Sequence, residues 1–137
     1  MVIRSTPISC SAAYAGSEPI AEARHLARRF LADLQNVHGL PVSERALDVV
    51  ELVVSELITN TRKYAPGPSR LHLEVRDGCV AVAVWDSNPK PPAILPPDPL
   101  RIGQQGLAIV ISVARTFAVE RDAAGKCITA SIALTDG

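Results

Sequence analysis

The sequence predicts an α/β (α+β) two-layer sandwich, in which a mixed, mostly antiparallel sheet carries helices on one face. Three observations predict it. Apolar residues recur at helical spacing in two long segments before residue 65 and in a shorter one after residue 105. Segments that alternate with a period of two follow them. Turns at 77–78 (Asp-Gly) and 124–126 (Ala-Gly-Lys) indicate tight hairpins, so much of the sheet is antiparallel. Helices packed on one face are the simplest arrangement.

Two long helices are expected in the first half of the chain. The first starts at residues 17–19 (Ser-Glu-Pro), with the serine as its cap, and stops at Gly39. The second starts at residues 43–44 (Ser-Glu), runs to about Lys63 and is ended by the Pro-Gly-Pro that follows. Because the second helix is apolar on almost every side, we expect it to be the central buried helix.

The strands are expected from their alternation. The segment that follows the first hairpin turn is apolar on both faces, which is typical of a central strand. A third helix is expected before the last two strands, and residues 1–15 contribute at most one short strand. The remaining expected elements are strands 70–76 and 79–85, the helix 106–116, and strands 117–121 and 127–134.

Between Asp86 and Gln105 lies a segment in which no regular element is expected. It contains six of the eleven prolines of the chain. Proline lacks the backbone N–H that helices and central strands need. A loop of this length inside a small domain is usually functional.

Length and composition restrict the class of protein. With 137 residues, we expect a single domain, 1–137. Fourteen basic against fourteen acidic residues argue against bulk binding to nucleic acid or to an anionic membrane. No apolar run reaches the roughly 20 residues of a membrane span, and the N-terminus lacks the apolar core of a signal peptide. The three scattered cysteines favour a reducing cytoplasm over a disulfide or zinc scaffold.

The second helix carries Glu56 and Asn60, whose spacing of four places them on one face. The amide oxygen of asparagine suits a hard cation such as Mg²⁺, and a glutamate can orient or deprotonate a nucleophile. Lys63 extends the same face and could meet a phosphate. Taken alone, this spacing more often marks a solvated stripe on a helix.

Two further features have both a functional and a structural interpretation. Asp86 follows the central strand and opens the long loop, either as a pocket floor or as a turn-forming residue. Gly103 and Gly106 lead into an apolar helix, where free N–H groups could hold an anion or the glycines could merely ease the turn.

In this order the motifs resemble a known family. The stretches VVSELITNTRKYA (53–65), VAVWDSNP (82–89), GQQGLAIV (103–110) and GKCITASIAL (125–134) are similar to those of the GHKL (histidine-kinase-like) ATPases, which share the Bergerat ATP-binding fold. Within that superfamily the chain resembles the RsbW-like anti-sigma-factor serine/threonine kinases. The resemblance covers nearly the whole chain.

The resemblance implies binding of ATP or ADP with Mg²⁺. Asn60 would ligate the Mg²⁺, Glu56 would be the general base, and Asp86 would accept a hydrogen bond from the adenine amino group. Residues 88–105 would form the lid over the nucleotide. The other residues expected to contact the nucleotide are Lys63, Asn88, Gly103, Gly106 and Leu107.

The resemblance also implies partners. These are a sigma factor and a STAS-type anti-anti-sigma protein, with a homodimer as the expected assembly and no direct contact with nucleic acid or membrane. Arg24, Arg28 and Arg29 are either a solvated face of the first helix or contacts to an acidic patch on the sigma factor.

Three departures from the family pattern leave a second function open. Asn88 stands where the D-x-G pattern has glycine, although asparagine tolerates a left-handed backbone better than most residues. Gln104 replaces a glycine of G-x-G-L, and the lid is rich in proline. The alternative is a non-catalytic module that sequesters a partner or senses a nucleotide. A small ATPase that acts without a partner is a third, less favoured reading.

Overall fold

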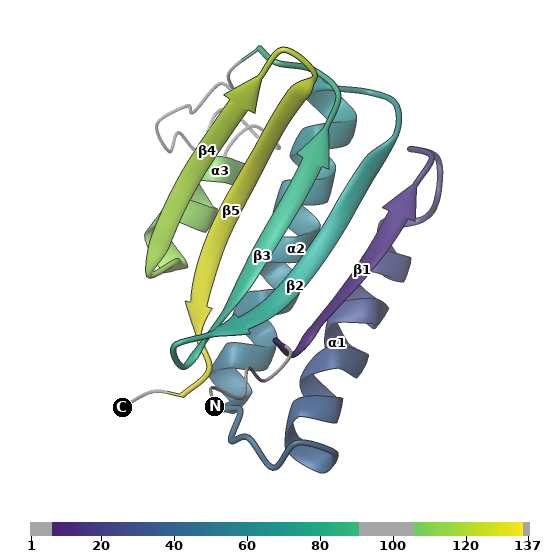
Figure 1. Ribbon diagram of the computed structural model, residues 1–137. Helices are drawn as coiled ribbons and strands as arrows, with labels where there is room; N and C mark the ends of the chain where they lie inside the picture. The colour runs from purple at the N-terminus through teal and green to yellow at the C-terminus, as the bar shows by residue number, and fades with distance from the viewer. Residues whose placement is uncertain (1–6, 91–105, 136–137) are drawn as a thin grey trace, which may run out of the picture.

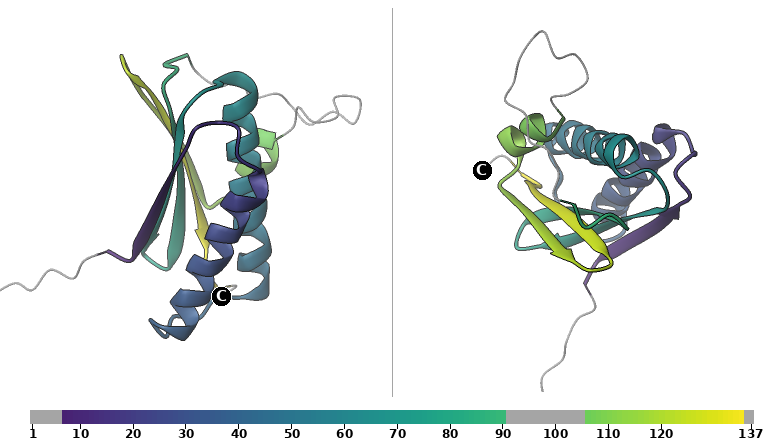
Figure 2. Two further views of the ribbon diagram at one scale, coloured as in Figure 1. Left: turned by 90° about the vertical axis from the view of Figure 1, so that its right-hand side faces the viewer. Right: turned by 90° about the horizontal axis from the view of Figure 1, so that it is seen from above.

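Five strands and three helices build a two-layer α+β sandwich in the computed structural model, which describes residues 7–90 and 106–135 (Figure 1). The strand order is β1-β2-β3-β5-β4, and all four pairings are antiparallel. The helices cover one face of the sheet (Figure 2). This confirms the predicted fold. The elements are β1 (Ser9–Tyr14), α1 (Ile20–Asn36), α2 (Glu44–Tyr64), β2 (Ser69–Arg76), β3 (Cys79–Asp86), α3 (Gly106–Val113), β4 (Thr116–Asp122) and β5 (Gly125–Ala133).

The start of α1 differs from the prediction that a serine caps it. The helix begins at Ile20 after Pro19, and no side chain caps it. Ser17 is instead part of the preceding turn, where the Glu18 carboxylate accepts hydrogen bonds from the backbone N–H groups of residues 15–17. Because the helix starts at Ile20, Pro19 stands at the cap position, and its ring offers no acceptor for the first N–H groups.

Helix α2 begins as predicted, since the Ser43 hydroxyl accepts a hydrogen bond from the Ala46 N–H over 3.0 Å. It packs against α1, α3 and the inner face of the sheet, which makes it the central helix. The expectation that it is buried on almost every side is wrong on one side, because Leu52 is 38% exposed. Its fully buried side chains include Val50, Val53, Val54, Leu57 and Ile58.

The last hairpin turns earlier than predicted. The Asp122 carboxylate accepts hydrogen bonds from the N–H groups of Ala124 and Gly125, and this turn closes the hairpin. Strand β5 therefore starts at Gly125, and Lys126, predicted in the turn, is a strand residue. Helix α3 likewise ends at Val113, three residues before the predicted end, because β4 follows almost at once.

The two faces of the sheet differ in composition. The inner face contributes to the apolar core, for example with Leu71, Val84 and Ile128. At the end of the sheet where β2 starts, the inner row turns polar and consists of Tyr14, Ser69, Asp86 and Lys126 on four neighbouring strands. The outer face carries no helix (Figure 2). No helix in the described ranges is long and apolar enough to cross a membrane.

Candidate functional site

Asp86, at the end of β3, lies on the inner face of the sheet and is almost completely buried, with 1% of its side chain exposed. Helix α2 ends at Tyr64, and only four residues separate it from β2, whose Ser69 pairs with Asp86. The last turn of α2 therefore lies at the same end of the sandwich as Asp86 (Figure 1). Asp86 also has the turn-forming role that the sequence offered as an alternative, since its Oδ1 accepts the N–H of Asn88 over 2.8 Å.

Lys126 pairs with Asp86 across β3 and β5, and only 4% of its side chain is exposed. Its Nζ donates to Asp86 Oδ1 and to the Asn88 carbonyl, each over 3.0 Å. Nζ is also 3.0 Å from Oδ2, but that contact lacks hydrogen-bond geometry, so Oδ2 has no hydrogen-bond partner among the described residues. One carboxylate oxygen is thus held in place and the other remains an open acceptor.

The backbone at Asn88 corrects one expectation. Asp77, with φ of 50°, is the one non-glycine residue with positive φ in the part of the chain that the structure describes. Asn88 therefore does not use the left-handed tolerance for which asparagine was considered. It is fixed instead by its N–H to Asp86 and by its own Oδ1, which accepts the N–H of Lys90 over 3.0 Å.

Gly125 allows the backbones of β3 and β5 to approach closely beside Asp86. A Cβ at this position would overlap the carbonyl oxygen of Asp86 and lie 3.0 Å from the Cα of Ser87. Both neighbours are backbone atoms and cannot turn away. A glycine is therefore needed here to keep Asp86 where it is.

The structure brings Glu56 of α2 to the start of α3. A Cβ on Gly106 would lie 2.6 Å from Glu56 Oε2, so the absence of a side chain there makes room for the carboxylate. Asn60, one turn further along α2, is buried with 8% exposed. Leu107 packs into the core, with 3% exposed, and anchors the start of α3.

The remaining residues predicted to contact the nucleotide are either exposed or outside the described residues. Lys63 is exposed, and its Nζ lies 5.6 Å from the ring centroid of Tyr64. Gly103, Gln104 and most of the predicted lid, residues 91–105, lie outside the described residues.

Four buried side-chain atoms without a hydrogen-bond partner gather at one end of the described fold. They are Thr61 Oγ1, Arg62 Nε, Ser69 Oγ and Asp86 Oδ2. They come from the end of α2, the start of β2 and the end of β3, which lie together (Figure 1). A buried polar atom without a partner costs about 1–3 kcal/mol, so such a cluster indicates a place where a polar ligand binds.

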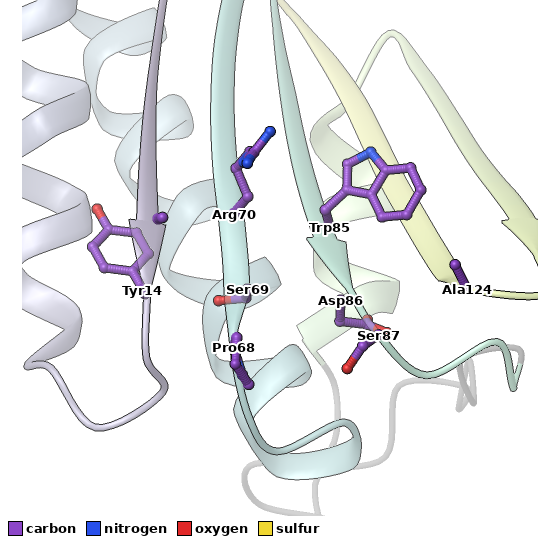
Figure 3. A pocket seen from close by; sticks show the side chains of 9 residues that line it. Tyr14, Pro68, Ser69, Arg70, Trp85, Asp86, Ser87 and Ala124 are labelled. Carbon is purple, nitrogen blue, oxygen red and sulfur yellow. The ribbon is translucent and has the colours of Figure 1, made fainter.

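A cavity of about 500 Å³ lies beside this end of the sheet. Asp86 contributes to it, whereas Arg70 and Trp85 line it from paired positions of β2 and β3 on the outer face (Figure 3). Trp85 is 42% exposed there. Glu56, Asn60 and Gly106 do not line this cavity. Of the residues named here, the cavity and the predicted nucleotide site therefore have only Asp86 in common.

The arginines of α1 are exposed and connect α1 to α2. Arg28 forms an ion pair with Glu51 over 2.7 Å, and Arg24 donates to the Ser55 hydroxyl over 3.3 Å. Arg28 and Arg29 also line a cavity of about 600 Å³ between α1 and β1. The solvated-face interpretation accounts for these contacts, and a role in partner binding stays a prediction.

Lys126 is the site residue that the sequence interpretation missed. It precedes Ile128, Ala130 and Ile132, which alternate on the inner face. Since the period of a strand is two, residue 126 shares their side of the sheet. Extending the alternation by one step would have placed a lysine on the buried face.

No group of three or more His, Cys, Asp or Glu side chains that could hold a metal is present within residues 7–90 and 106–135. Mg²⁺ that travels with a nucleotide is in general held through one or two side chains, waters and phosphates.

Comparison with known proteins identifies the family. Residues 18–132 match the family of histidine kinase-like ATPase domains, and the chain belongs to it. No curated protein matches the chain. Among solved structures, it resembles the RsbU and RsbW domains of Rv1364c from Mycobacterium tuberculosis, with a TM-score of 0.64 and 17% identity. That match covers 94% of this chain and 33% of the other, so this chain spans about a third of its length. At this identity the likeness is one of fold.

Proposed function

We propose that this chain binds ATP with Mg²⁺ and acts as an anti-sigma factor that phosphorylates a serine or threonine of a STAS-type antagonist. The observation that carries the proposal is that Asp86 and three other residues with buried polar atoms lacking a hydrogen-bond partner belong to elements that meet at one end of the fold, where α2 carries Asn60. Membership in the histidine kinase-like ATPase family supports a nucleotide as the ligand. The proposed partners and a homodimeric assembly follow the RsbW likeness.

The residues present fit a nucleotide. Asp86 Oδ2 is a buried acceptor without a hydrogen-bond partner among the described residues, which suits the amino group of adenine. The start of α3 presents backbone N–H groups that suit phosphate. Asn60 offers an amide oxygen that suits Mg²⁺, with Lys63 further along the same helix.

In this mechanism the chain positions the reacting groups. Glu56, beside Gly106, would take the proton of the attacking hydroxyl as it approaches the terminal phosphate. When bound, Mg²⁺ would neutralise charge on the phosphates. Leu107 fixes the start of α3 through its burial in the core. Phosphoryl transfer depends on such positioning and charge neutralisation more than on covalent chemistry, so this small set of side chains suffices.

Calorimetric titration with ATP and with ADP, each with Mg²⁺, tests the binding part. We expect micromolar binding by the unaltered chain and its loss in Asp86→Ala. Asp48→Ala is the matched control, because it makes the same change at an exposed aspartate near the start of α2, the end of that helix away from Asn60. Absence of binding by the unaltered chain would contradict the proposal.

A phosphate-transfer assay with candidate STAS-type proteins tests the catalytic part. Glu56→Gln should lower the transfer rate by about 10²-fold or more, the usual size of a general-base contribution, while leaving ATP affinity nearly unchanged. Gly106→Ala should lower it as well, because its methyl group displaces the Glu56 carboxylate. Glu44→Gln, the same chemical change at the other end of α2, should have no effect. Equal rates for Glu56→Gln and the unaltered chain would argue against transfer.

One observation favours the non-catalytic alternative. Asp86 Oδ1 is already occupied by Lys126 and by the Asn88 N–H, so a nucleotide meets a carboxylate with part of its capacity used. A partner-binding module of this kind would retain the sigma factor without ATP. Stoichiometric phosphorylation of a STAS-type protein would exclude it.

A further inference from the structure

The buried ion pair of Asp86 and Lys126 has a consequence for the proposed nucleotide site. An ionised carboxylate only accepts hydrogen bonds, whereas a protonated one also donates. A buried carboxylate without a counter-ion takes up a proton to avoid the cost of a buried charge. The Lys126 ammonium, 3.0 Å from both oxygens of Asp86, supplies that counter-ion.

Lys126 also orients the carboxylate. It donates to Oδ1 and to the Asn88 carbonyl, while the Asn88 N–H donates to the same Oδ1. Two donors thus hold Oδ1, and Oδ2 is left as a buried acceptor without a hydrogen-bond partner among the described residues. The hydroxyl of Ser69, which pairs with Asp86 in the sheet, is another buried polar atom without such a partner.

We propose that Lys126 is a positioning residue that keeps Asp86 an acceptor-only group, and that this makes the site select a 6-amino purine over a 6-oxo purine. The inference rests on the proposed function, because it assumes that Asp86 receives the base. The 6-amino group of adenine donates to Oδ2. The 6-oxo group of hypoxanthine would face it with a second acceptor, and two acceptors without a shared proton repel.

Removal of the lysine charge should therefore change the choice of base. In Lys126→Gln the side-chain amide can still donate to the Asn88 carbonyl, but Asp86 loses its counter-ion and takes up a proton. The resulting O–H can donate to a 6-oxo group. Lys126→Arg retains the charge and should retain the choice of base. Arg45→Gln removes a positive charge from an exposed residue near the start of α2 and serves as the control.

The experiment is calorimetric titration of each folded variant with ATP and with ITP, which differ at position 6 of the base. The unaltered chain should prefer ATP by about 10- to 100-fold, the range for a hydrogen bond to a charged group. Lys126→Arg and Arg45→Gln should keep this preference, and Lys126→Gln should lose most of it. Thermal unfolding checks that each variant is folded.

A second variant covers the case in which Lys126→Gln does not fold. Asp86→Asn combined with Lys126→Gln removes both charges together, which buried pairs tolerate better than the loss of one partner. Because an amide both donates and accepts, this double variant should bind ATP and ITP about equally.

The outcomes separate this inference from the proposed function. No binding of ATP by the unaltered chain overturns both. The inference alone is overturned if Lys126→Gln keeps the preference for ATP. It is also overturned if Lys126→Arg loses that preference together with Lys126→Gln. Equal weakening of ATP and ITP in Lys126→Gln also overturns it, since it would show a merely structural role.

Discussion

Two ion pairs of similar length lie in opposite surroundings in this molecule. Arg28 and Glu51 connect α1 to α2 over 2.7 Å, and their side chains are 65% and 19% exposed. Lys126 and Asp86 connect β5 to β3 over 3.0 Å, and theirs are 4% and 1% exposed. In the first pair the arginine is mostly in water and the glutamate is partly exposed, whereas the second pair is enclosed by the sheet and the helices.

The difference in exposure shows which charges cost free energy to bury. In water the attraction between charges is screened, and hydration compensates for a lost partner. In the interior the attraction is screened less and hydration is lost, so each buried charge needs the other as its counter-ion. A buried pair that leaves one oxygen without a hydrogen-bond partner is therefore a candidate site, whereas the Arg28–Glu51 pair is a local contact between two helices.

The largest expected effect is on the buried pair. Lys126→Met should lower the free energy of unfolding by about 3–5 kcal/mol, because it leaves Asp86 buried without a counter-ion. Asp86→Asn combined with Lys126→Met should recover much of that loss. Urea denaturation measures both, with Lys90→Met as the control at an exposed lysine. If the double variant is as unstable as the single one, the pair is not coupled.

Gly125→Ala should perturb the same pair from the backbone. Its methyl group would overlap the Asp86 carbonyl, and overpacking of this kind costs about 1–3 kcal/mol. Gly39→Ala is the control, since Gly39 has φ of 66° but no atom near its missing Cβ, and should cost about 1 kcal/mol. Urea denaturation compares the two variants. A smaller loss in Gly125→Ala than in Gly39→Ala would contradict the close-approach argument.

Glu18 lies between the two extremes in exposure and tests the role of fixed hydrogen bonds. Backbone N–H groups, first that of Ala15 and also those of Glu18 itself and Gly16, lower the pKa of its carboxyl from 4.5 to about 2. Because the folded pKa is the lower one, its contribution to stability is present above pH 4.5 and is lost as the pH falls toward 2.

Glu18→Gln should therefore be less stable than the unaltered chain at pH 7, and the two should converge between pH 4.5 and 2. Urea denaturation at several pH values measures this convergence. A stability difference that stays constant down to pH 2 would show that the hydrogen bonds do not depend on the ionised form.

The smallest effect is expected at the exposed pair. A double-mutant cycle of Arg28→Ala and Glu51→Ala should give a coupling energy of about 0.2–1 kcal/mol that falls as salt is added. A coupling energy as large as that of Asp86 with Lys126 would remove the contrast between the two pairs.

Much of the fold could be predicted from local pattern. The 3.6-residue spacing located α1 and α2, and the Asp77-Gly78 turn located the β2–β3 hairpin. The ends were less predictable. In the turn before α1 and in the last hairpin turn, the carboxylates of Glu18 and Asp122 accept hydrogen bonds from nearby backbone N–H groups, which pattern alone does not resolve.

The candidate site could be predicted in part. The spacing of four put Glu56 and Asn60 on one helix face, and Asp86 was expected at the end of the central strand. The proximity of Glu56 to Gly106, fifty residues later in the chain, depends on how α2 and α3 pack. The partner of Asp86 could not be predicted either. Lys126 is forty residues away in the chain, and its strand was expected to start only at Cys127.

The sequence by itself determined most of the elements and their order, because propensity and hydrophobic period act over a few neighbouring residues. Only the tertiary structure decided which polar groups meet inside. It paired β3 with β5 in the register that sets Lys126 against Asp86, and it left Oδ2 of that carboxylate without a hydrogen-bond partner among the described residues. Burial and pairing are properties of contacts between distant segments, and they turn an ordinary aspartate into a candidate site.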